Sequence, residues 1–165
     1  MSQTTSLRPI TKNDVQGVYD TAFEAWHYTY RDIFSPQFID TFVNRNYAPD
    51  VSLRLLPQVE ACEQFFHVAV QHAIVIGFCN IVNLAGKMEL RRIYLRPAFI
   101  GQGIGRTLLE AGEAFVQSKG FDCYFCFVHQ DNEIGKRFYA KNKFVHISEY
   151  DEDDEWYLEK KLRSQ

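Results

Sequence analysis

One stretch of this chain decides its fold: Arg91-Arg92-Ile93-Tyr94-Leu95-Arg96-Pro97-Ala98-Phe99-Ile100-Gly101-Gln102-Gly103-Ile104-Gly105-Arg106-Thr107-Leu108-Leu109. Residues 90–95 are rich in types that favour a strand, and Pro97 lacks the N–H group that a strand ladder needs. From Ile104 onward the apolar residues recur at helical spacing. The stretch therefore predicts a strand, a loop with alternating glycines, and a helix.

The start of this predicted helix has the features of an anion site. Gly101, Gly103 and Gly105 let the backbone turn tightly and approach a ligand closely. The first N–H groups of a helix have no partner within it, and the helix dipole adds positive charge there. Pyrophosphate is the usual occupant of such a site. A plain turn into a core helix is the alternative, because glycine-rich turns alone are weak signals.

Two nucleotide-binding motifs fit this turn poorly. A Walker-type phosphate loop needs Gly-Lys-Ser or Gly-Lys-Thr after its second glycine, and that run is absent. A dinucleotide fingerprint needs G-x-G-x-x-G directly after a strand and an acidic residue about 20 positions later. Here the glycines alternate, and the region near Phe125 is apolar.

Two blocks of the sequence resemble the GNAT family of N-acetyltransferases. Residues 94–97 followed by 101–106 are similar to the family's acyl-CoA-binding motif, Arg/Gln-x-x-Gly-x-Gly/Ala. Residues 132–144 are similar to its later block, N-x-x-A-x-x-F-Y-x-K-x-G-F. The gap between the blocks matches the family without insertion, and the resemblance covers about residues 7–162. Among the branches, the chain looks most like the polyamine (spermidine/spermine) acetyltransferases.

The resemblance implies acetyl-CoA as co-substrate and no metal. It assigns acetyl-CoA binding to Ile93, Tyr94, Leu95, Gly101, Gln102, Gly103, Ile104, Gly105, Arg106 and Asn132. Asn132 is also a good helix N-cap, and both roles can hold together. Three positions depart from the pattern: Ile100 replaces arginine or glutamine, Gly135 replaces alanine, and Lys143 replaces glycine. We expect Ile100 to weaken cofactor binding and Lys143 to alter its turn.

Acetyl transfer to an amine needs a proton acceptor for the amine and an acid for the departing thiolate. The resemblance implies Tyr139 as the acid, although Phe138-Tyr139 could instead be a core aromatic pair. Glu89 is the candidate base, directly or through water, against the alternative of a surface glutamate on a strand. His129 is a weaker alternative base, because histidine titrates near neutral pH.

The acceptor site is expected on the first long helix and the loop after it. By resemblance Glu24, Trp26, Tyr28 and Tyr30 form its wall, although Trp26 and Tyr30, four apart, could simply be core. The acidic run at residues 149–155 suits a cationic acceptor or a solvated hairpin tip. The predicted function is acetylation of a small, polyamine-like amine. The alternatives are a protein N-terminal or lysine acetyltransferase, and a module that binds CoA without turnover.

Composition limits the class of protein. The 165 residues are 46% hydrophobic and 24% charged, which predicts one globular domain over residues 1–165. A net charge of −3 gives no whole-chain argument for nucleic acid or membrane binding, and residues 1–6 do not resemble a signal peptide. We expect a cytoplasmic protein whose four cysteines are reduced thiols in apolar surroundings. Cys123 and Cys126 have redox or zinc spacing but fall on a predicted strand and are interpreted as structural. The sequence leaves open whether the protein forms a homodimer.

The order of the predicted elements indicates an α/β (α+β) fold with a mixed, mostly antiparallel sheet and helices on both faces, as in the GNAT-type acyl-CoA N-acyltransferases. Strands are expected at residues 7–9, 65–70, 74–82, 88–95, 122–129, 144–150 and 156–161. Helix starts are expected at the capping box of residues 11–14, at Ser35-Pro36, at Asp50, at Ile104 and near Asn132, with a polar link at residues 44–49.

Overall fold

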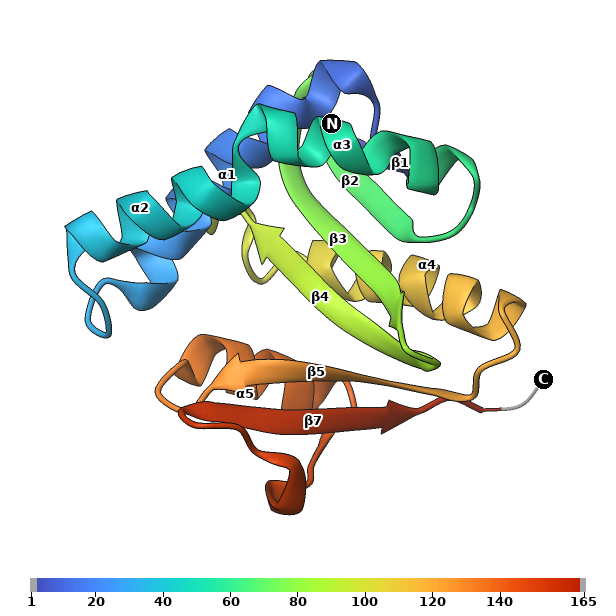
Figure 1. The fold of residues 1–165 in the computed structure, drawn as a ribbon. Coiled ribbons are helices and arrows are strands. Elements are labelled where there is room, and N and C mark those ends of the chain that lie inside the picture. Colours follow the sequence, from blue (N-terminus) through green and yellow to red (C-terminus); the bar gives the residue numbers. More distant parts are fainter. Residues whose placement is uncertain (1–2, 164–165) are drawn as a thin grey trace.

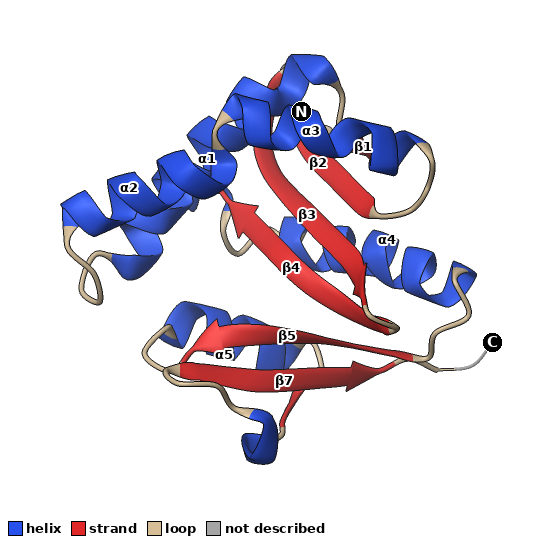
Figure 2. Ribbon diagram, in the orientation of Figure 1, coloured by secondary structure: helices blue, strands red, loops and turns tan. Residues whose placement is uncertain are grey.

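The computed structural model describes residues 3–163, which build one seven-stranded mixed sheet with helices on both faces (Figure 1, Figure 2). Met1 and Ser2, part of the segment judged unlike a signal peptide, lie outside the described residues. The sheet order is β1-β2-β3-β4-β5-β7-β6, and only the β4–β5 pair is parallel among the described strands. The strands are β1 (Ser6–Pro9), β2 (Phe65–Gln71), β3 (Ile74–Leu84), β4 (Lys87–Leu95), β5 (Cys123–His129), β6 (Val145–His146) and β7 (Glu155–Lys161).

Two apolar clusters lie on the two faces of the sheet. Helices α4 (Ile104–Ser118) and α5 (Glu133–Lys141) cover one face, where Leu108 and Val116 are fully buried. Helices α1 (Val15–Tyr30), α2 (Pro36–Tyr47) and α3 (Pro49–Glu60) cover the other face. Three short 3-10 helices complete the described chain: η1 (Lys12–Asp14), η2 (Pro97–Phe99) and η3 (Ser148–Tyr150). Within the described residues, no helix is long and apolar enough to span a bilayer. The predicted fold class is confirmed.

A two-residue turn joins β2 to β3, and side-chain caps begin the first helices. His72 and Ala73 both have positive φ angles, as the two-residue turn that suits twisted strands requires. Asp14 accepts the Thr11 N–H at 2.8 Å and closes the predicted capping box. At the start of α2, the Ser35 hydroxyl accepts the N–H of Phe38 at 3.1 Å.

Strands β4 and β5 meet at one point and then diverge. Glu89 and Phe125 are the one pair registered between them among the described residues. Figure 1 shows the two strands spreading apart toward their carboxyl ends. The crossover through α4 makes β4 and β5 parallel, so both carboxyl ends reach the same edge of the opening. This divergence creates the space for the site.

Three details of the predicted element map are wrong. The expected link at residues 44–49 is helical, because α2 continues to Tyr47 and α3 begins at Pro49. Asp50 lies in the first turn of α3, whose N-cap is Ala48, so Asp50 does not cap this helix.

The strand expected at residues 144–150 is shorter in the structure and spans only Val145–His146. The Asp151 carboxylate accepts the N–H of Tyr157 at 2.8 Å and binds His146 Nε2 at 2.9 Å. These side-chain bonds take the place of further ladder bonds, and the chain turns into η3 instead.

The cysteines differ in their surroundings. Cys79 and Cys126 are buried in the core, and burial raises the pKa of both thiols. Cys123 is half-buried. Cys62 is exposed at the end of α3, so the expectation that all four cysteines lie in apolar surroundings is wrong for this residue.

Lys143 adopts the backbone conformation that favours the glycine of the family pattern. Its φ is 73°, in the left-handed region. Its N–H donates to the carbonyl of Ala140 at 3.1 Å, and the N–H of Phe144 donates to that of Tyr139 at 3.0 Å. The helix therefore ends in a left-handed cap despite the departure.

Lys143→Gly is expected to raise the free energy of unfolding by about 0.5–1 kcal/mol. The relief of backbone strain should exceed the extra flexibility that glycine gives the unfolded chain. Urea unfolding measures the change. As a control, Lys141→Gly removes a side chain inside the last turn of α5 and should lower stability by about 1 kcal/mol. A lower urea midpoint for Lys143→Gly would show that the cap is not strained.

Candidate active site

A cavity of about 320 Å³ lies where β4 and β5 separate. The carboxyl ends of both strands line it, together with residues from α1, α2, α5 and the first turn of α4. Much of its wall is aromatic: Trp26, Tyr30, Phe42, Tyr47, Tyr94, Phe127, Phe138 and Tyr139. Such a concave, largely apolar space with a few polar groups is the usual form of a small-molecule site.

The glycine-rich turn lies at the mouth of this cavity. Gly101 and Gly103 have φ angles of 85° and 83°, and Gly103 is the N-cap of α4. The N–H groups of residues 101–106 donate no hydrogen bond within the described part of the chain. Gly105 lines the cavity, so the unsatisfied donors and the cavity adjoin. This arrangement can hold an anionic group at the helix start while the rest of a ligand extends inward.

The remaining residues assigned to acetyl-CoA fall into two groups. Ile93, Tyr94 and Leu95 line the cavity from β4. Gly101, Gln102, Gly103 and Arg106 are exposed beside the mouth, whereas Ile104 is buried in the core. The Arg106 side chain donates to Glu110 at 3.0 Å.

Two departures from the family pattern can be placed as well. Ile100 lines the cavity and is partly exposed, so an apolar side chain stands at its rim. A methyl group on Gly135 would lie 2.6 Å from the Asn132 amide nitrogen. Glycine at this position therefore avoids a clash with the Asn132 side chain.

Asn132 connects the site to two helices. Its side-chain oxygen accepts the N–H of Gly135 at 2.8 Å and so caps α5. Its amide nitrogen donates to the hydroxyl of Tyr30 on α1 at 3.4 Å. Asn132 is buried and lines the cavity, so the cap and the site share one side chain.

Tyr139 is both a core aromatic residue and a cavity residue. Its ring packs edge-on against Phe138 and Phe144, with centroids 5.4 and 5.2 Å apart. Burial raises the pKa of Tyr139 well above its ordinary value, and the nearby Cys126 thiol adds to the effect. The hydroxyl therefore stays protonated at neutral pH and can serve as a proton donor.

Comparison with known proteins agrees with this geometry. A sequence model of the acetyltransferase (GNAT) family matches residues 21–144. The spermidine N(1)-acetyltransferase of Thermoplasma acidophilum is 30% identical over 159 residues, which is 96% of this chain and 98% of that protein. The chain belongs to the GNAT acetyltransferase family.

Solved structures show the same fold. The PaiA N-acetyltransferase of Thermoplasma acidophilum, crystallised with coenzyme A, superposes with a TM-score of 0.91 at 28% identity, covering 96% of this chain and 99% of that one. A GCN5-related N-acetyltransferase from Rhodopseudomonas palustris gives 0.74 at 20% identity, covering 98% and 99%, which supports the fold alone. This protein is an N-acetyltransferase whose fold binds acetyl-CoA or CoA.

Of the four residues expected to form the acceptor wall, two line the cavity of the acetyltransferase. Trp26 and Tyr30 are buried, their rings pack at a tilt with centroids 4.2 Å apart, and both also form part of the second apolar cluster. Both residues therefore belong to the core and also line the cavity. Glu24 and Tyr28 do not line the cavity: Glu24 pairs with Arg96 at 3.0 Å, and Tyr28 lies partly exposed beneath Arg31.

Glu89, the expected base, does not line the cavity of the acetyltransferase. Its carboxylate accepts two hydrogen bonds from Arg91, at 2.9 and 3.2 Å. It lies beside Phe125 at the one registered pair of β4 and β5, before the strands diverge. Arg91, by contrast, does line the cavity.

Sequence reasoning missed several cavity residues of the acetyltransferase. Tyr47 follows Ile39 and Val43 at helical spacing, but it falls within the link that the polar residues at 44–49 predict. Glu155 was interpreted as the end of the acidic run, although it is also the first residue of β7. His129, considered only as a weaker base, lines the cavity beside Glu155.

Proposed function

We propose that this acetyltransferase moves the acetyl group of acetyl-CoA to a primary amine of a small cationic acceptor of the polyamine type. One observation carries the proposal: a single cavity adjoins the glycine-rich start of α4 and the aromatic wall of α1 and α2. The two ends of this cavity offer different chemistry. One end has backbone N–H groups that can bind a phosphate, and the other has aromatic faces that can bind a cation.

The pyrophosphate of acetyl-CoA is assigned to the N–H groups of residues 101–106. Binding there satisfies donors that have no acceptor within the described chain. The acyl arm then runs along Ile93, Tyr94 and Leu95 toward Asn132. This path would bring the thioester close to Tyr139.

The reaction joins the amine nitrogen to the acetyl carbon and breaks the carbon–sulfur bond. An ammonium ion brings three protons: one leaves to a base before attack, one remains on the amide, and one ends on the CoA sulfur. Tyr139 donates to the departing thiolate and regains a proton from the amine nitrogen. Its raised pKa keeps it protonated until the thiolate forms.

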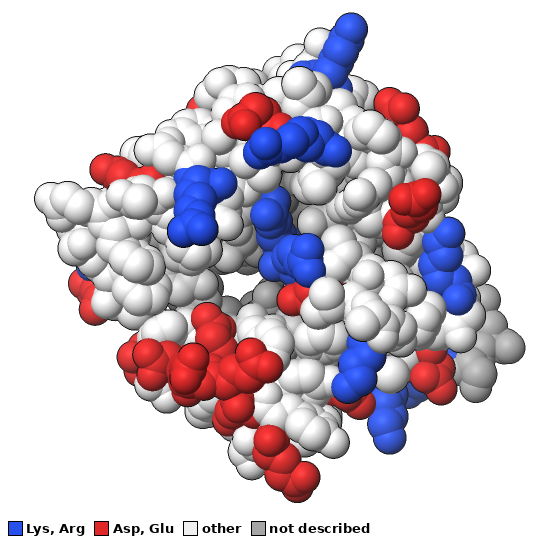
Figure 3. All heavy atoms as spheres, viewed as in Figure 1, with Lys and Arg blue, Asp and Glu red and all other residues white. Residues whose placement is uncertain are grey.

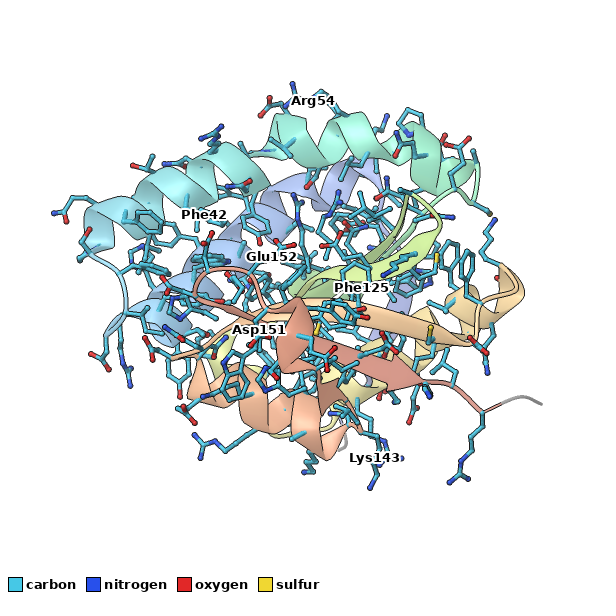
Figure 4. The ribbon with its side chains drawn as sticks, turned by 60° about the horizontal axis from the view of Figure 1, so that its bottom comes forward. Phe42, Arg54, Phe125, Lys143, Asp151 and Glu152 are labelled. Carbon is cyan, nitrogen blue, oxygen red and sulfur yellow. The ribbon has the colours of Figure 1, made fainter. Side chains whose placement is uncertain are left out.

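A cationic acceptor suits the surfaces around the cavity. Trp26 and Tyr30 present aromatic faces, each worth about 0.5–2 kcal/mol to a cation. Figure 3 shows acidic side chains gathered at the lower left, over the left-hand ends of β5 and β7 in Figure 1, beside a hollow in the surface. Asp151 and Glu152 lie on the loop that leads into β7 (Figure 4). The related spermidine N(1)-acetyltransferase adds support.

Spermidine is expected to give a higher kcat/KM than a neutral-headed amino acid or a peptide with a free N-terminus. Release of free thiol from acetyl-CoA measures all three. Salt should raise the KM for spermidine, because it screens attraction between exposed charges. Faster acetylation of the peptide would instead identify a protein N-acetyltransferase, and the family assignment would stand.

The acidic run is tested with Glu152→Gln and Asp153→Asn together. Both side chains are exposed, so the pair should raise the KM for spermidine by roughly 2–5-fold at low salt and leave kcat unchanged. Glu60→Gln, an exposed change on α3, is the matched control. If the double variant and Glu60→Gln change the KM for spermidine equally, the acidic run does not contribute to acceptor binding.

A further inference from the structure

The cavity has few groups that could accept a proton from the acceptor. Among its lining residues in the described chain, the ionisable ones are Tyr30, Tyr47, Arg91, Tyr94, His129, Tyr139 and Glu155. Arginine has no acceptor atom, so Arg91 cannot act as a base. Burial raises the pKa of each of the four tyrosines, so their hydroxyls stay protonated and offer no phenolate base at neutral pH. His129 and Glu155 remain.

The basic nitrogen of His129 is already occupied. Its Nδ1 accepts the backbone N–H of Asp131 at 3.1 Å. A neutral imidazole with an acceptor at Nδ1 carries its proton on Nε2, so its second nitrogen is a donor and not a base. Taking a proton from a substrate would break the bond to Asp131. His129 is therefore the poorer of the two bases.

Glu155 is held at the cavity by the backbone around it. It is the first residue of β7 and the antiparallel partner of His129 on β5, so their side chains share one face of the sheet. Its N–H donates to the carbonyl of Glu152 at 2.8 Å and its carbonyl accepts the N–H of Glu152 at 3.0 Å. The carbonyl of Asp154 accepts the N–H of Gln130 at 2.8 Å. The turn thus fixes where Glu155 points.

We propose that Glu155, and not Glu89, accepts the proton that the acceptor ammonium loses before attack. This assignment rests on the proposed amine acetylation. Glu155 supplies the one carboxylate of the cavity lining in the described residues, whereas Glu89 lies outside it and is paired with Arg91.

The proton balance is complete with these groups. A primary alkylammonium has a pKa near 10.4, so about one molecule in 10³ is the free amine at pH 7. The Glu155 carboxylate takes one ammonium proton and later releases it to water. The nitrogen lone pair then forms the bond to the acetyl carbon. The carbon–sulfur bond breaks, and the sulfur keeps its electron pair and takes a proton from Tyr139. Tyr139 regains a proton from the attacking nitrogen, which keeps its last proton in the amide.

The surroundings of Glu155 strengthen its carboxylate as a base. Burial raises the pKa of the Glu155 carboxyl, His129 opposes the rise, and Asp154 adds to it. From the other elements packed nearby, the Tyr30 hydroxyl and the Cys126 thiol also interact with it. A carboxylate with a raised pKa is a stronger base than an exposed one.

The test is the pH dependence of kcat/KM with spermidine in wild type, Glu155→Gln and Glu89→Gln. Glu155→Gln should lose about 10²-fold at pH 7, and the loss should shrink toward pH 10, where solvent deprotonates the amine. Glu155→Asp keeps a carboxylate and should keep the wild-type pH dependence at a lower rate. Glu159→Gln, on β7 but outside the cavity lining, is the matched control.

Melting curves and CoA calorimetry check that each variant is folded. A wild-type profile in Glu155→Gln, or a pH-independent loss, would overturn the assignment. A pH-dependent loss in Glu89→Gln alone would return the role to Glu89. If wild type does not acetylate spermidine, the proposed acceptor class fails; the amino acid or peptide that it does acetylate then enters the same comparison, which still decides the role of Glu155.

Discussion

Gly103→Val combined with Gly105→Val is expected to weaken CoA binding by more than about 10²-fold, a loss of at least about 2.7 kcal/mol. Gly103 has a φ of 83°, which a β-branched residue adopts only under strain. A Cβ on Gly105 would lie 2.9 Å from the Phe138 ring, at the cavity wall. The double change should misdirect the N–H groups at the start of α4 and fill part of the acyl path.

Calorimetry with CoA measures this loss, and melting curves show whether the variant is folded. Gly86→Val and Gly120→Val are the matched controls. These glycines have φ angles of 88° and 84° with open space around them, so valine adds backbone strain away from the cavity. Both controls should lose stability and keep CoA affinity. Unchanged affinity in the double variant would mean that the pyrophosphate binds elsewhere.

Tyr139→Phe is expected to lower kcat by about 10–10³-fold with little change in acetyl-CoA affinity. Phenylalanine keeps the ring that packs against Phe138 and Phe144 and removes only the hydroxyl. The loss of a general acid affects the transition state and leaves ground-state binding largely intact. Because the pKa of Tyr139 is raised well above its ordinary value, the variant should be impaired throughout the neutral range.

Steady-state kinetics with saturating acceptor measures kcat, and calorimetry measures acetyl-CoA affinity. The matched control is Tyr157→Phe, which removes a hydroxyl that donates to Glu159 outside the cavity lining. That variant should turn over like wild type. If Tyr139→Phe also does, another group protonates the thiolate and Tyr139 is only a core residue.

Several features of this protein could be predicted because they depend on neighbours along the chain. Positive φ angles at Gly101 and Gly103, the Ser35 cap and the capping box at Thr11 are all set by a few adjacent residues. The two GNAT blocks are likewise local patterns, and the family follows from them. Trp26 and Tyr30 share a helix face by spacing alone.

The identity of the cavity carboxylate could not be predicted in this way. A β-bulge between Asn80 and Ile81 moves their partners on β4 from Arg92 to Leu90 and skips Arg91. Leu90 and Leu95 therefore join the same apolar cluster, although alternation would place them on opposite faces. Simple alternation from Leu95 thus misjudges the face of every residue on the strand before the bulge, Glu89 included.

Sequence alone determined the order of elements, the glycine-rich helix start and the family, because each of these depends on residues that are close together in the chain. Only the tertiary structure decided which side chains meet. Strand pairing brings Glu155 next to His129, although the two are 26 positions apart in the sequence. A hydrogen bond joins Asn132 to Tyr30, which are 102 positions apart. Such contacts depend on strand register, a bulge and the divergence of β4 from β5. These are properties of the packed sheet, and no local pattern of residues encodes them.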